Sequence, residues 1–96
     1  MTDLCNKINE FGRAVSNASR YRIIESLLKG EKTVSELVKI VKLSQPAVSQ
    51  HLKTLRSSNL VTDERRGQEV YYSVDGPYIL GLLASLACDV RNRKKT

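Results

Sequence analysis

Two capped helical segments stand a short turn apart in the middle of this chain. The residues Thr33-Val34-Ser35-Glu36 match a capping box, in which the threonine side chain accepts a hydrogen bond from a backbone N–H one turn on and the glutamate reaches back. Ser44 can cap the next helix, and Pro46 is tolerated in its first turn, where a backbone N–H has no helical partner. The turn between the two helices spans residues 42–44. Two helices joined in this way are typical of a helix-turn-helix unit.

The spacing of apolar residues changes along the chain from a helical period to a strand period and back. Five segments repeat apolar residues at steps of three and four, as helices do. Residues 61–74 instead alternate on either side of Gly67, which predicts two strands joined at a basic tip. Gly30 is placed to end the second helix as a left-handed cap, and Gly76-Pro77 ends the sheet and begins the last helix. The apolar helical positions, in chain order, are Leu4, Ile8, Phe11 and Val15; Ile23, Ile24, Leu27 and Leu28; Leu37, Ile40 and Val41; Val48, Leu52 and Leu55; and Ile79, Leu82, Leu83, Leu86 and Val90.

These elements predict a mainly α fold with one β-hairpin, in the order helix, helix, helix, helix, strand, strand, helix. Residues 1–96 are enough for one domain with a modest core and too few for two. With 41% hydrophobic and 27% charged residues, the composition is that of a folded protein and not of a disordered one. The order of elements predicts a winged helix-turn-helix domain, in which the hairpin is the wing.

No segment of the sequence predicts a membrane span or a secretory signal. The longest apolar run, residues 79–88, is interrupted by Gly81 and Ser85 and is too short to cross a bilayer. The first seven residues lack a basic start followed by an apolar stretch. We therefore expect a cytoplasmic protein without a membrane partner.

The second helix of the central pair, residues 44–58, presents a polar face without acidic residues. No Asp or Glu occurs from residue 44 to residue 60, and the net charge of +6 favours an anionic partner such as nucleic acid. Glutamine can bond two edge atoms of adenine, hydroxyl side chains can reach a base or a phosphate, and alanine can contact the thymine methyl group. We predict that this helix enters the major groove of DNA, the alternative being an ordinary polar helix face. Its predicted exposed residues are Gln45, Ala47, Ser49, Gln50, Lys53 and Thr54.

Three motifs around this helix resemble one protein family. They are Val34-Ser35-Glu36-Leu37, then Leu43-Ser44-Gln45-Pro46-Ala47-Val48-Ser49-Gln50-His51-Leu52-Lys53-Thr54-Leu55, and Leu60-Val61 with Val70-Tyr71-Tyr72. The motifs resemble those of the ArsR/SmtB family of bacterial and archaeal repressors, over nearly the whole chain. The resemblance implies a homodimer that represses transcription at a DNA operator and leaves it when a small inducer arrives. Together with the helix histidine and the wing-tip arginines that match the family pattern, the predicted DNA-binding residues are Ser44, Gln45, Ala47, Ser49, Gln50, His51, Lys53, Thr54, Arg65 and Arg66.

His51, the only histidine, has two open interpretations. Its position matches the histidine of the family's DNA-reading helix, which implies a contact with a phosphate or a base. The alternative is a partly buried helix residue that packs beside Leu52. Without partner ligands it cannot form a metal site.

Dimerisation is expected from the limited reach of one helix-turn-helix unit. One unit reads only a few base pairs, and a two-fold dimer doubles the contacts and the specificity. The first and last helices carry apolar stripes that the small core cannot fully cover, and in the family the equivalent helices build the dimer interface. We expect these stripes to pack both within the chain and across the dimer. The predicted interface residues are Leu4, Ile8, Phe11, Ile79, Leu82, Leu83 and Leu86.

The metal sites of the family are not matched in this sequence. Members with a thiolate site on the third helix carry cysteines at the positions where this chain has Thr33 and Ser35. Members with a zinc site on the last helix use Asp and His ligands, and here Asp89 stands without a histidine. We therefore predict no family-type metal site and no cofactor.

Cys5 and Cys88, the only cysteines, lie on the predicted first and last helices. As a pair at the dimer interface they are a candidate thiol sensor, able to form a disulfide, to bind a persulfide bridge or to hold a soft ion with a third ligand. A sulfur-sensing branch of the family carries a cysteine on its last helix, which Cys88 matches, but Glu25 stands where the partner cysteine would be. The alternative is that both are small, buried apolar residues. The chemical identity of the inducer therefore stays open.

The sequence does not predict an enzyme, because it has one histidine, no glycine-rich phosphate loop and no nucleophile elbow. Two alternatives to a sequence-specific repressor remain. A winged helix can serve as a protein-interaction adaptor, and a sequence-tolerant DNA binder would bind weakly and with strong salt dependence. The acid-free helix and the basic wing favour DNA over a protein partner.

Overall fold

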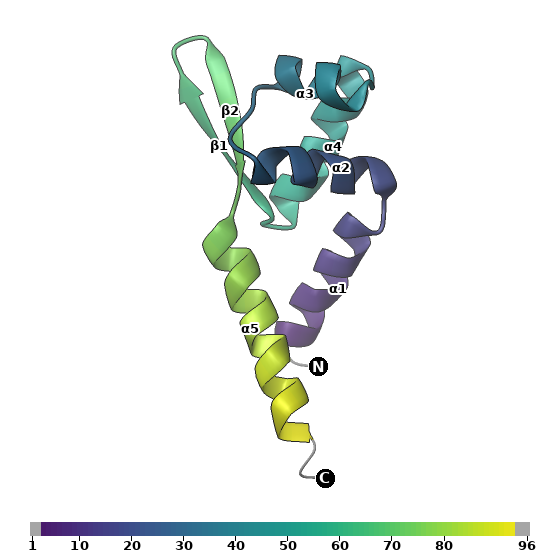
Figure 1. Cartoon of the computed structure of the whole chain (residues 1–96), viewed down its shortest axis with the longest axis vertical. Coiled ribbons are helices and arrows are strands. Elements are labelled where there is room, and N and C mark those ends of the chain that lie inside the picture. Colours follow the sequence, from purple (N-terminus) through teal and green to yellow (C-terminus); the bar gives the residue numbers. More distant parts are fainter. Residues whose placement is uncertain (1–2, 94–96) are drawn as a thin grey trace.

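The computed structural model describes residues 3–93 and has the predicted order of elements. Four helices come first, a two-stranded antiparallel hairpin follows, and a long helix ends the described chain (Figure 1). The elements are α1 (Asp3–Val15), α2 (Ala18–Leu28), α3 (Val34–Val41), α4 (Gln45–Ser57), β1 (Val61–Arg66), β2 (Glu69–Val74) and α5 (Gly76–Arg93). The helix-turn-helix unit is α3 with α4, and we call the β1–β2 hairpin the wing.

Side-chain caps begin four of the helices, and in α5 the Asp75 carboxylate accepts from the N–H of Tyr78. The Asn17 side chain accepts a hydrogen bond from the backbone of Arg20 at the start of α2. The predicted capping box of α3 is present: the Thr33 hydroxyl accepts from the N–H of Glu36, and the Glu36 carboxylate accepts from the N–H of Thr33. Ser44 caps α4 as predicted. These bonds satisfy N–H groups that have no partner inside the helix, and so they set where each helix begins.

The turns after α2 and α3 both use a backbone with positive φ. Gly30 follows α2 with a φ of 146°, a positive value that residues with a side chain rarely adopt. A positive φ was expected here, because Gly30 was predicted to end this helix. Lys42 ends α3 in the left-handed conformation, with a φ of 59°. The sequence did not indicate this role for a lysine. The left-handed residue reverses the chain within a few positions and so allows α4 to start at once.

The core lies where α2, α3, α4 and the start of β1 meet, and its stripes follow the predicted helical spacing with two exceptions. Leu28 was predicted to be buried but is 63% exposed, and Ile40, an apolar position of the third helix, is exposed as well. Each stands one residue from a buried neighbour, and one residue turns a helix by about 100°. That rotation takes the side chain off the narrow face that the small core covers. The buried apolar residues of this core are Ala14, Ile23, Ile24, Leu27, Leu37, Val41, Val48, Leu52, Leu55, Leu60 and Val61.

The wing projects from the body and is tied to it along β2. Its register runs from Val61 opposite Val74 to Arg66 opposite Glu69. Lys32, in the loop before α3, forms a bridge with Tyr72 through two backbone hydrogen bonds of 3.0 and 2.8 Å. This bridge occupies part of the outer edge of β2, which a lone hairpin would leave unpaired.

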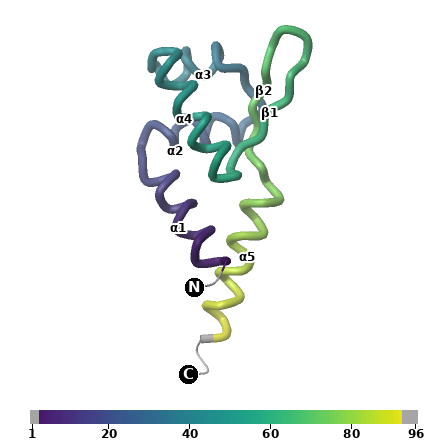
Figure 2. The backbone as a smooth tube through the Cα atoms, turned by 180° about the vertical axis from the view of Figure 1, so that it is seen from behind, coloured from purple at the N-terminus to yellow at the C-terminus, as the bar shows by residue number. Residues whose placement is uncertain are grey.

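Helices α1 and α5 leave the body on the side opposite the wing and converge, as the front and rear views show (Figures 1 and 2). They give the molecule its elongated shape, with extents of 53 × 24 × 23 Å. Leu82 of α5 is only 4% exposed because it packs toward α1. Among the described residues, no helix has the length and apolar character needed to cross a membrane.

Candidate nucleic-acid interface

The rotation of α4 about its axis is set by three buried residues on one face. Val48, Leu52 and Leu55 are at most 1% exposed and hold this face against the core. The opposite face is therefore turned to solvent. It carries four of the predicted DNA-reading side chains, all of them exposed: Gln45, Ser49, Gln50 and Lys53.

Three other predicted contacts lie on a half-buried side of the same helix. Ala47, His51 and Thr54 follow one another at steps of four and three and are each partly covered. Thr54 borders a hollow that Arg20 of α2 also lines. This strip faces the junction of α1 and α2 more than open solvent, so its residues are less available to a ligand than those of the exposed face.

His51 lies in this strip with one ring nitrogen covered. Nδ1 is buried and has no hydrogen-bond partner among the described residues. Burial lowers the pKa of His51 below 6.5, and the positive charge of Arg20 lowers it further. Arg20 is itself held in place, since its Nε donates to the backbone oxygen of Ala14 at 2.8 Å. The neutral imidazole is thus the favoured form at neutral pH, which supports the packing interpretation and leaves the DNA contact a prediction.

The lowered pKa of His51 predicts how stability depends on pH. The unfolded chain binds a proton at the ordinary pKa near 6.5, whereas the folded chain binds it only at lower pH. The contribution of a neutral His51 is therefore present above that ordinary value and is lost as the pH falls through the folded value. We expect urea denaturation to give a free energy of unfolding that declines from pH 7.5 toward about pH 5. His51→Gln should flatten this decline, and an unchanged pH profile in the variant would contradict the assignment.

The two predicted wing-tip arginines differ in their surroundings. Arg65 is exposed. The Arg66 guanidinium donates to both carboxylate oxygens of Glu31, at 2.6 and 2.8 Å, and to Glu64 at 2.8 Å. It also lies 4.7 Å from the ring centroid of Tyr71. The hydrogen bond from Arg66 holds the pKa of Glu31 below its usual range, and the two carboxylates raise the pKa of Arg66.

A hollow of about 300 Å³ lies between α4 and the wing and adds three residues that were not predicted as DNA contacts. It is lined by Ser49 and Lys53, which were predicted, and by Arg56, Ser57 and Tyr72, which were not. Arg56 also pairs with Asp63 of β1 at 3.2 Å, so it links the end of α4 to the wing. Arg56 could have been predicted to lie near Lys53, because it follows Lys53 by one helical step of three residues. Tyr72 could not have been predicted from such a pattern, because the direction of its ring depends on the pleat of the wing and on where the wing lies against α4.

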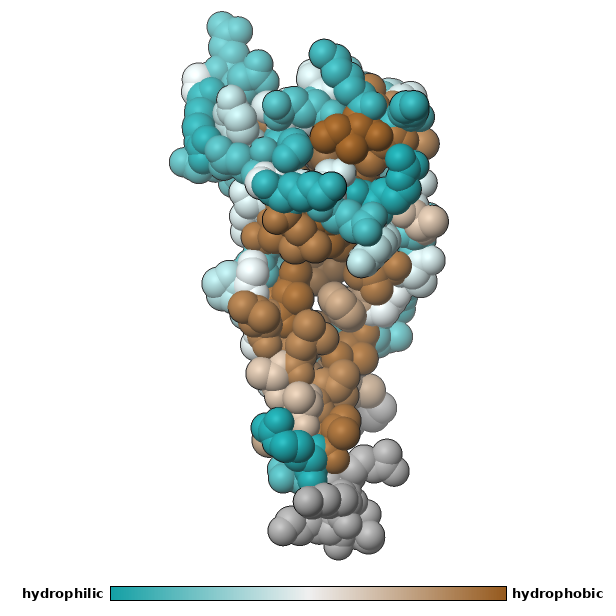
Figure 3. All heavy atoms as spheres, in the orientation of Figure 1, coloured by the Kyte–Doolittle hydropathy of each residue, from teal (hydrophilic) through white to brown (hydrophobic). Residues whose placement is uncertain are grey.

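The predicted dimer residues divide into a covered and an exposed group. Leu82 is buried, Phe11 and Ile79 pack against the core, and Leu4 and Ile8 are half-buried. Leu83 and Leu86 are exposed on α5. Leu80 and Val90, at helical spacing from them, are exposed as well and were not among the predicted interface residues. Figure 3 shows that apolar side chains gather over the part of the molecule that α1 and α5 build, whereas hydrophilic ones cover the wing end.

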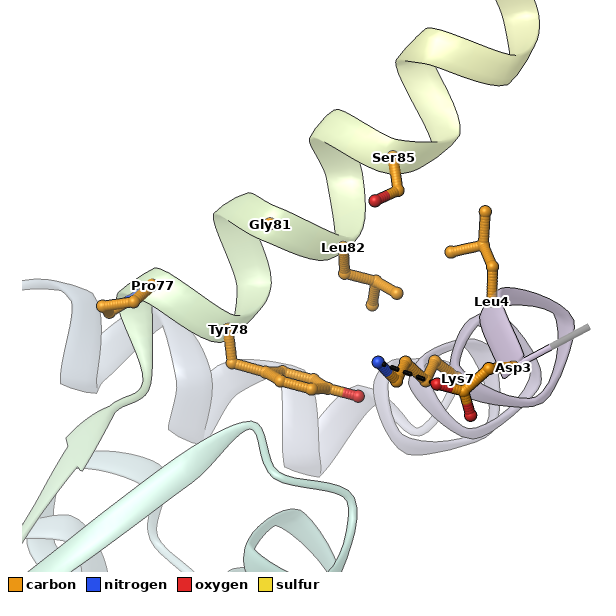
Figure 4. A pocket seen from close by; sticks show the side chains of 8 residues that line it. All are labelled: Asp3, Leu4, Lys7, Pro77, Tyr78, Gly81, Leu82 and Ser85. Atoms are coloured by element: carbon orange, nitrogen blue, oxygen red, sulfur yellow. Dashed lines mark ion pairs between the residues drawn. The ribbon is translucent and has the colours of Figure 1, made fainter.

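A hollow of about 480 Å³ opens where α1 and α5 converge (Figure 4). Leu4 and Leu82 point toward each other across it, and Lys7 pairs with Asp3 at its edge, at 3.2 Å. The Tyr78 hydroxyl points toward Lys7. The two helices are thus in contact but leave a partly apolar space between them.

Both cysteines are exposed, so the alternative that they are small buried residues was wrong. The reason is that α1 and α5 extend beyond the core and have solvent on most of their sides. Asn92 donates a hydrogen bond to the Cys88 sulfur at 3.7 Å. Within residues 3–93 there is no group of three His, Cys, Asp or Glu residues placed to hold a metal ion.

Helices α3 and α4, followed directly by a β-hairpin with two arginines near its tip, define a winged helix-turn-helix protein. Residues 17–63 match the family model described as "Bacterial regulatory protein, arsR family". The chain is 43% identical to the nodulation protein NolR of Rhizobium meliloti over 77 residues, which cover 80% of this chain and 63% of NolR. It is 31% identical to the arsenical resistance operon repressor of Bacillus subtilis, covering 97% of this chain and 90% of that one. The chain belongs to the ArsR/SmtB family of regulatory proteins, as its motifs predicted, and this family is not one of enzymes.

The solved structures agree with the family assignment. The crystal structure of NolR from Sinorhizobium fredii superposes with a TM-score of 0.72 at 38% identity, covering 86% of this chain and 83% of that one. This chain spans a little under two thirds of some curated relatives, 63% of the Rhizobium meliloti NolR and 64% of the SmtB homolog of Synechocystis. The family model covers the helix-turn-helix unit and the start of β1, whereas the structural likeness extends over 86% of the chain.

Proposed function

We propose that this chain is a sequence-specific, dimeric DNA-binding repressor that inserts α4 into the major groove of an operator. The main support is the exposed face of α4, which is polar and has no acidic residue. The buried residues Val48, Leu52 and Leu55 on the other side of the helix keep this face turned to solvent. Gln45 and Gln50 on this face have the bidentate amide groups that read adenine. Lys53 and the wing's Arg65 supply positive charge for the phosphates on either side. Relatives named as repressors support the same role.

The dimer is proposed to form through α1 and α5. The exposed leucines of α5 face solvent in the single chain, although apolar side chains of this size are stabilised by burial. The neighbouring Leu82 and Leu4 already join α5 to α1 within the chain. A second copy packed on the outer face of α5 would place two copies of α4 side by side, as a two-fold operator requires.

The inducer is proposed to act on the α1–α5 part of the molecule, where thiol chemistry has access. Cys5 and Cys88 are exposed on these two helices, so a small reagent can reach them. A direct disulfide requires Cα atoms within about 7 Å of each other, in one chain or across the dimer. Thiol sensing stays a prediction.

Selection of bound sites from random double-stranded DNA tests the proposed function. We expect an enriched site with two-fold symmetry and half-sites spaced by about one helical turn. Binding to the selected site should weaken with salt and should exceed binding to random DNA by about 10³-fold or more.

The other outcomes of the selection identify the alternatives. Salt-dependent binding without an enriched site would indicate a sequence-tolerant DNA binder. A folded chain with no measurable DNA binding at low salt would contradict the proposal and favour a protein-interaction adaptor.

A further inference from the structure

We infer that Arg66 is not a phosphate contact but a positioning residue, which joins Glu31 and Glu64 in a clamp that holds the wing against the loop before α3. We call these three residues the wing clamp. The inference rests on the proposed function, in which the wing meets DNA. It separates two adjacent arginines that the family pattern treats alike, and leaves Arg65 as the wing's phosphate contact.

The wing clamp engages three of the five N–H donors of the Arg66 guanidinium. Nη1 and Nη2 each donate to one oxygen of Glu31, in the two-pronged arrangement that also suits a phosphate. Nη2 donates further to Glu64, and Tyr71 covers the guanidinium from one side. Two carboxylates surround one cation, so the net charge of the cluster is negative. A phosphate that approached Arg66 would therefore meet a cluster with a net negative charge.

The direction of side chains along β1 explains why the two arginines differ. Successive residues of a strand point to opposite faces, so Glu64 and Arg66 share one face while Asp63 and Arg65 share the other. The first face meets Glu31 from the loop between α2 and α3. On the second face Asp63 pairs with Arg56 of α4. Arg65 therefore lies on the side of the wing that is turned toward the recognition helix.

The wing clamp connects the wing to the helix-turn-helix unit through a very short path. Glu31 is followed by Lys32, which makes the backbone bridge to Tyr72, and then by Thr33, the cap of α3. The loop is thus bonded to β2 by backbone and to the end of β1 by side chains. A two-stranded hairpin is marginally stable by itself. These two attachments fix its direction relative to α3 and, through the tight turn at Lys42, relative to α4.

The test compares Glu31→Gln, Arg66→Gln and Arg65→Gln by operator affinity across a salt series. Arg65→Gln should flatten the slope of log affinity against log salt by about one unit, as the loss of a phosphate contact does. Arg66→Gln should weaken binding on the order of threefold to tenfold without changing that slope. Glu31→Gln should also weaken binding, although it removes a negative charge. The double variant Glu31→Gln with Arg66→Gln should be no weaker than the single variants.

Glu25→Gln is the matched control, since Glu25 is an exposed acid on α2, outside the wing clamp, and forms no ion pair with the described residues. This change should leave binding equal or slightly tighter. If Glu31→Gln also tightens binding and steepens the salt slope, Arg66 is a phosphate contact and the inference is wrong. Additive losses in the double variant would likewise overturn it.

Wing motion in the free protein distinguishes failure of the clamp from failure of the proposed function. Backbone ¹⁵N relaxation of residues 63–70 should show greater nanosecond mobility in Glu31→Gln and Arg66→Gln than in the parent and in Glu25→Gln. This measurement needs no DNA. If the parent binds no DNA but the mobility changes as expected, only the proposed function fails. Unchanged mobility in both clamp variants would overturn the inference whatever the DNA result.

Discussion

Replacing Leu83 by glutamate is expected to abolish tight operator binding while the chain stays folded. Leu83 is 42% exposed in the single chain, so a charge at this position can remain hydrated in the monomer. In the proposed dimer the same carboxylate would be buried in an apolar interface without a partner, which would make the free energy of dimerisation less favourable by several kcal/mol. A monomer engages one half-site only, and loss of the linked second half-site lowers affinity by about 10²- to 10⁴-fold.

Sedimentation equilibrium and operator binding measure the two parts of this result. Leu28→Glu is the matched control, because Leu28 is an exposed leucine on α2, away from α5. It should leave both the dimer and the affinity unchanged. A Leu83→Glu protein that remains dimeric, or a folded monomer that still binds the whole operator tightly, would show that the two subunits meet elsewhere.

Replacing Gln50 by alanine is expected to remove specificity and to leave general DNA binding almost intact. Gln50 is exposed on α4, and a bidentate amide contact with adenine is worth about 1–3 kcal/mol of discrimination in each half-site. This corresponds to roughly a 5- to 150-fold weaker affinity for the selected operator per half-site. Affinity for random DNA should barely change, because that binding depends on phosphate contacts. Gln45→Ala should behave in the same way if Gln45 also reads a base.

Gln68→Ala provides the control for the loss of a glutamine side chain. Gln68 lies in the turn of the wing, where contacts with the backbone of DNA are expected. Its removal should change the affinity for operator and random DNA by similar factors. If Gln50→Ala and Gln68→Ala have the same effect on the ratio of the two affinities, α4 does not read bases through Gln50.

Most of the fold could be predicted from the sequence because its signals are local. The capping box at Thr33, the cap at Ser44 and the glycine after α2 act on backbone groups within a turn of themselves. The stripe of Val48, Leu52 and Leu55 needs only the helical period to define an inner face. Once that face is known, the exposed side of α4 follows. Helix α4, which we propose to read DNA, could therefore be predicted with its bounds from the sequence alone.

The remaining assignments depended on residues far apart in the chain. Arg65 and Arg66 are alike in sequence, but only Arg66 meets Glu31, which lies 35 residues earlier. Leu82 and Leu83 are adjacent leucines, yet the packing of α1 covers one and leaves the other to a partner or to solvent. The sequence left two interpretations of His51 open, and the packing interpretation gained support only from the fold, which buries Nδ1 and brings the charge of Arg20 near it. Local patterns in the sequence determine which residues form helices and strands. The partner of an exposed charge or leucine is decided by how those elements pack, because each such contact joins segments that are far apart in the sequence.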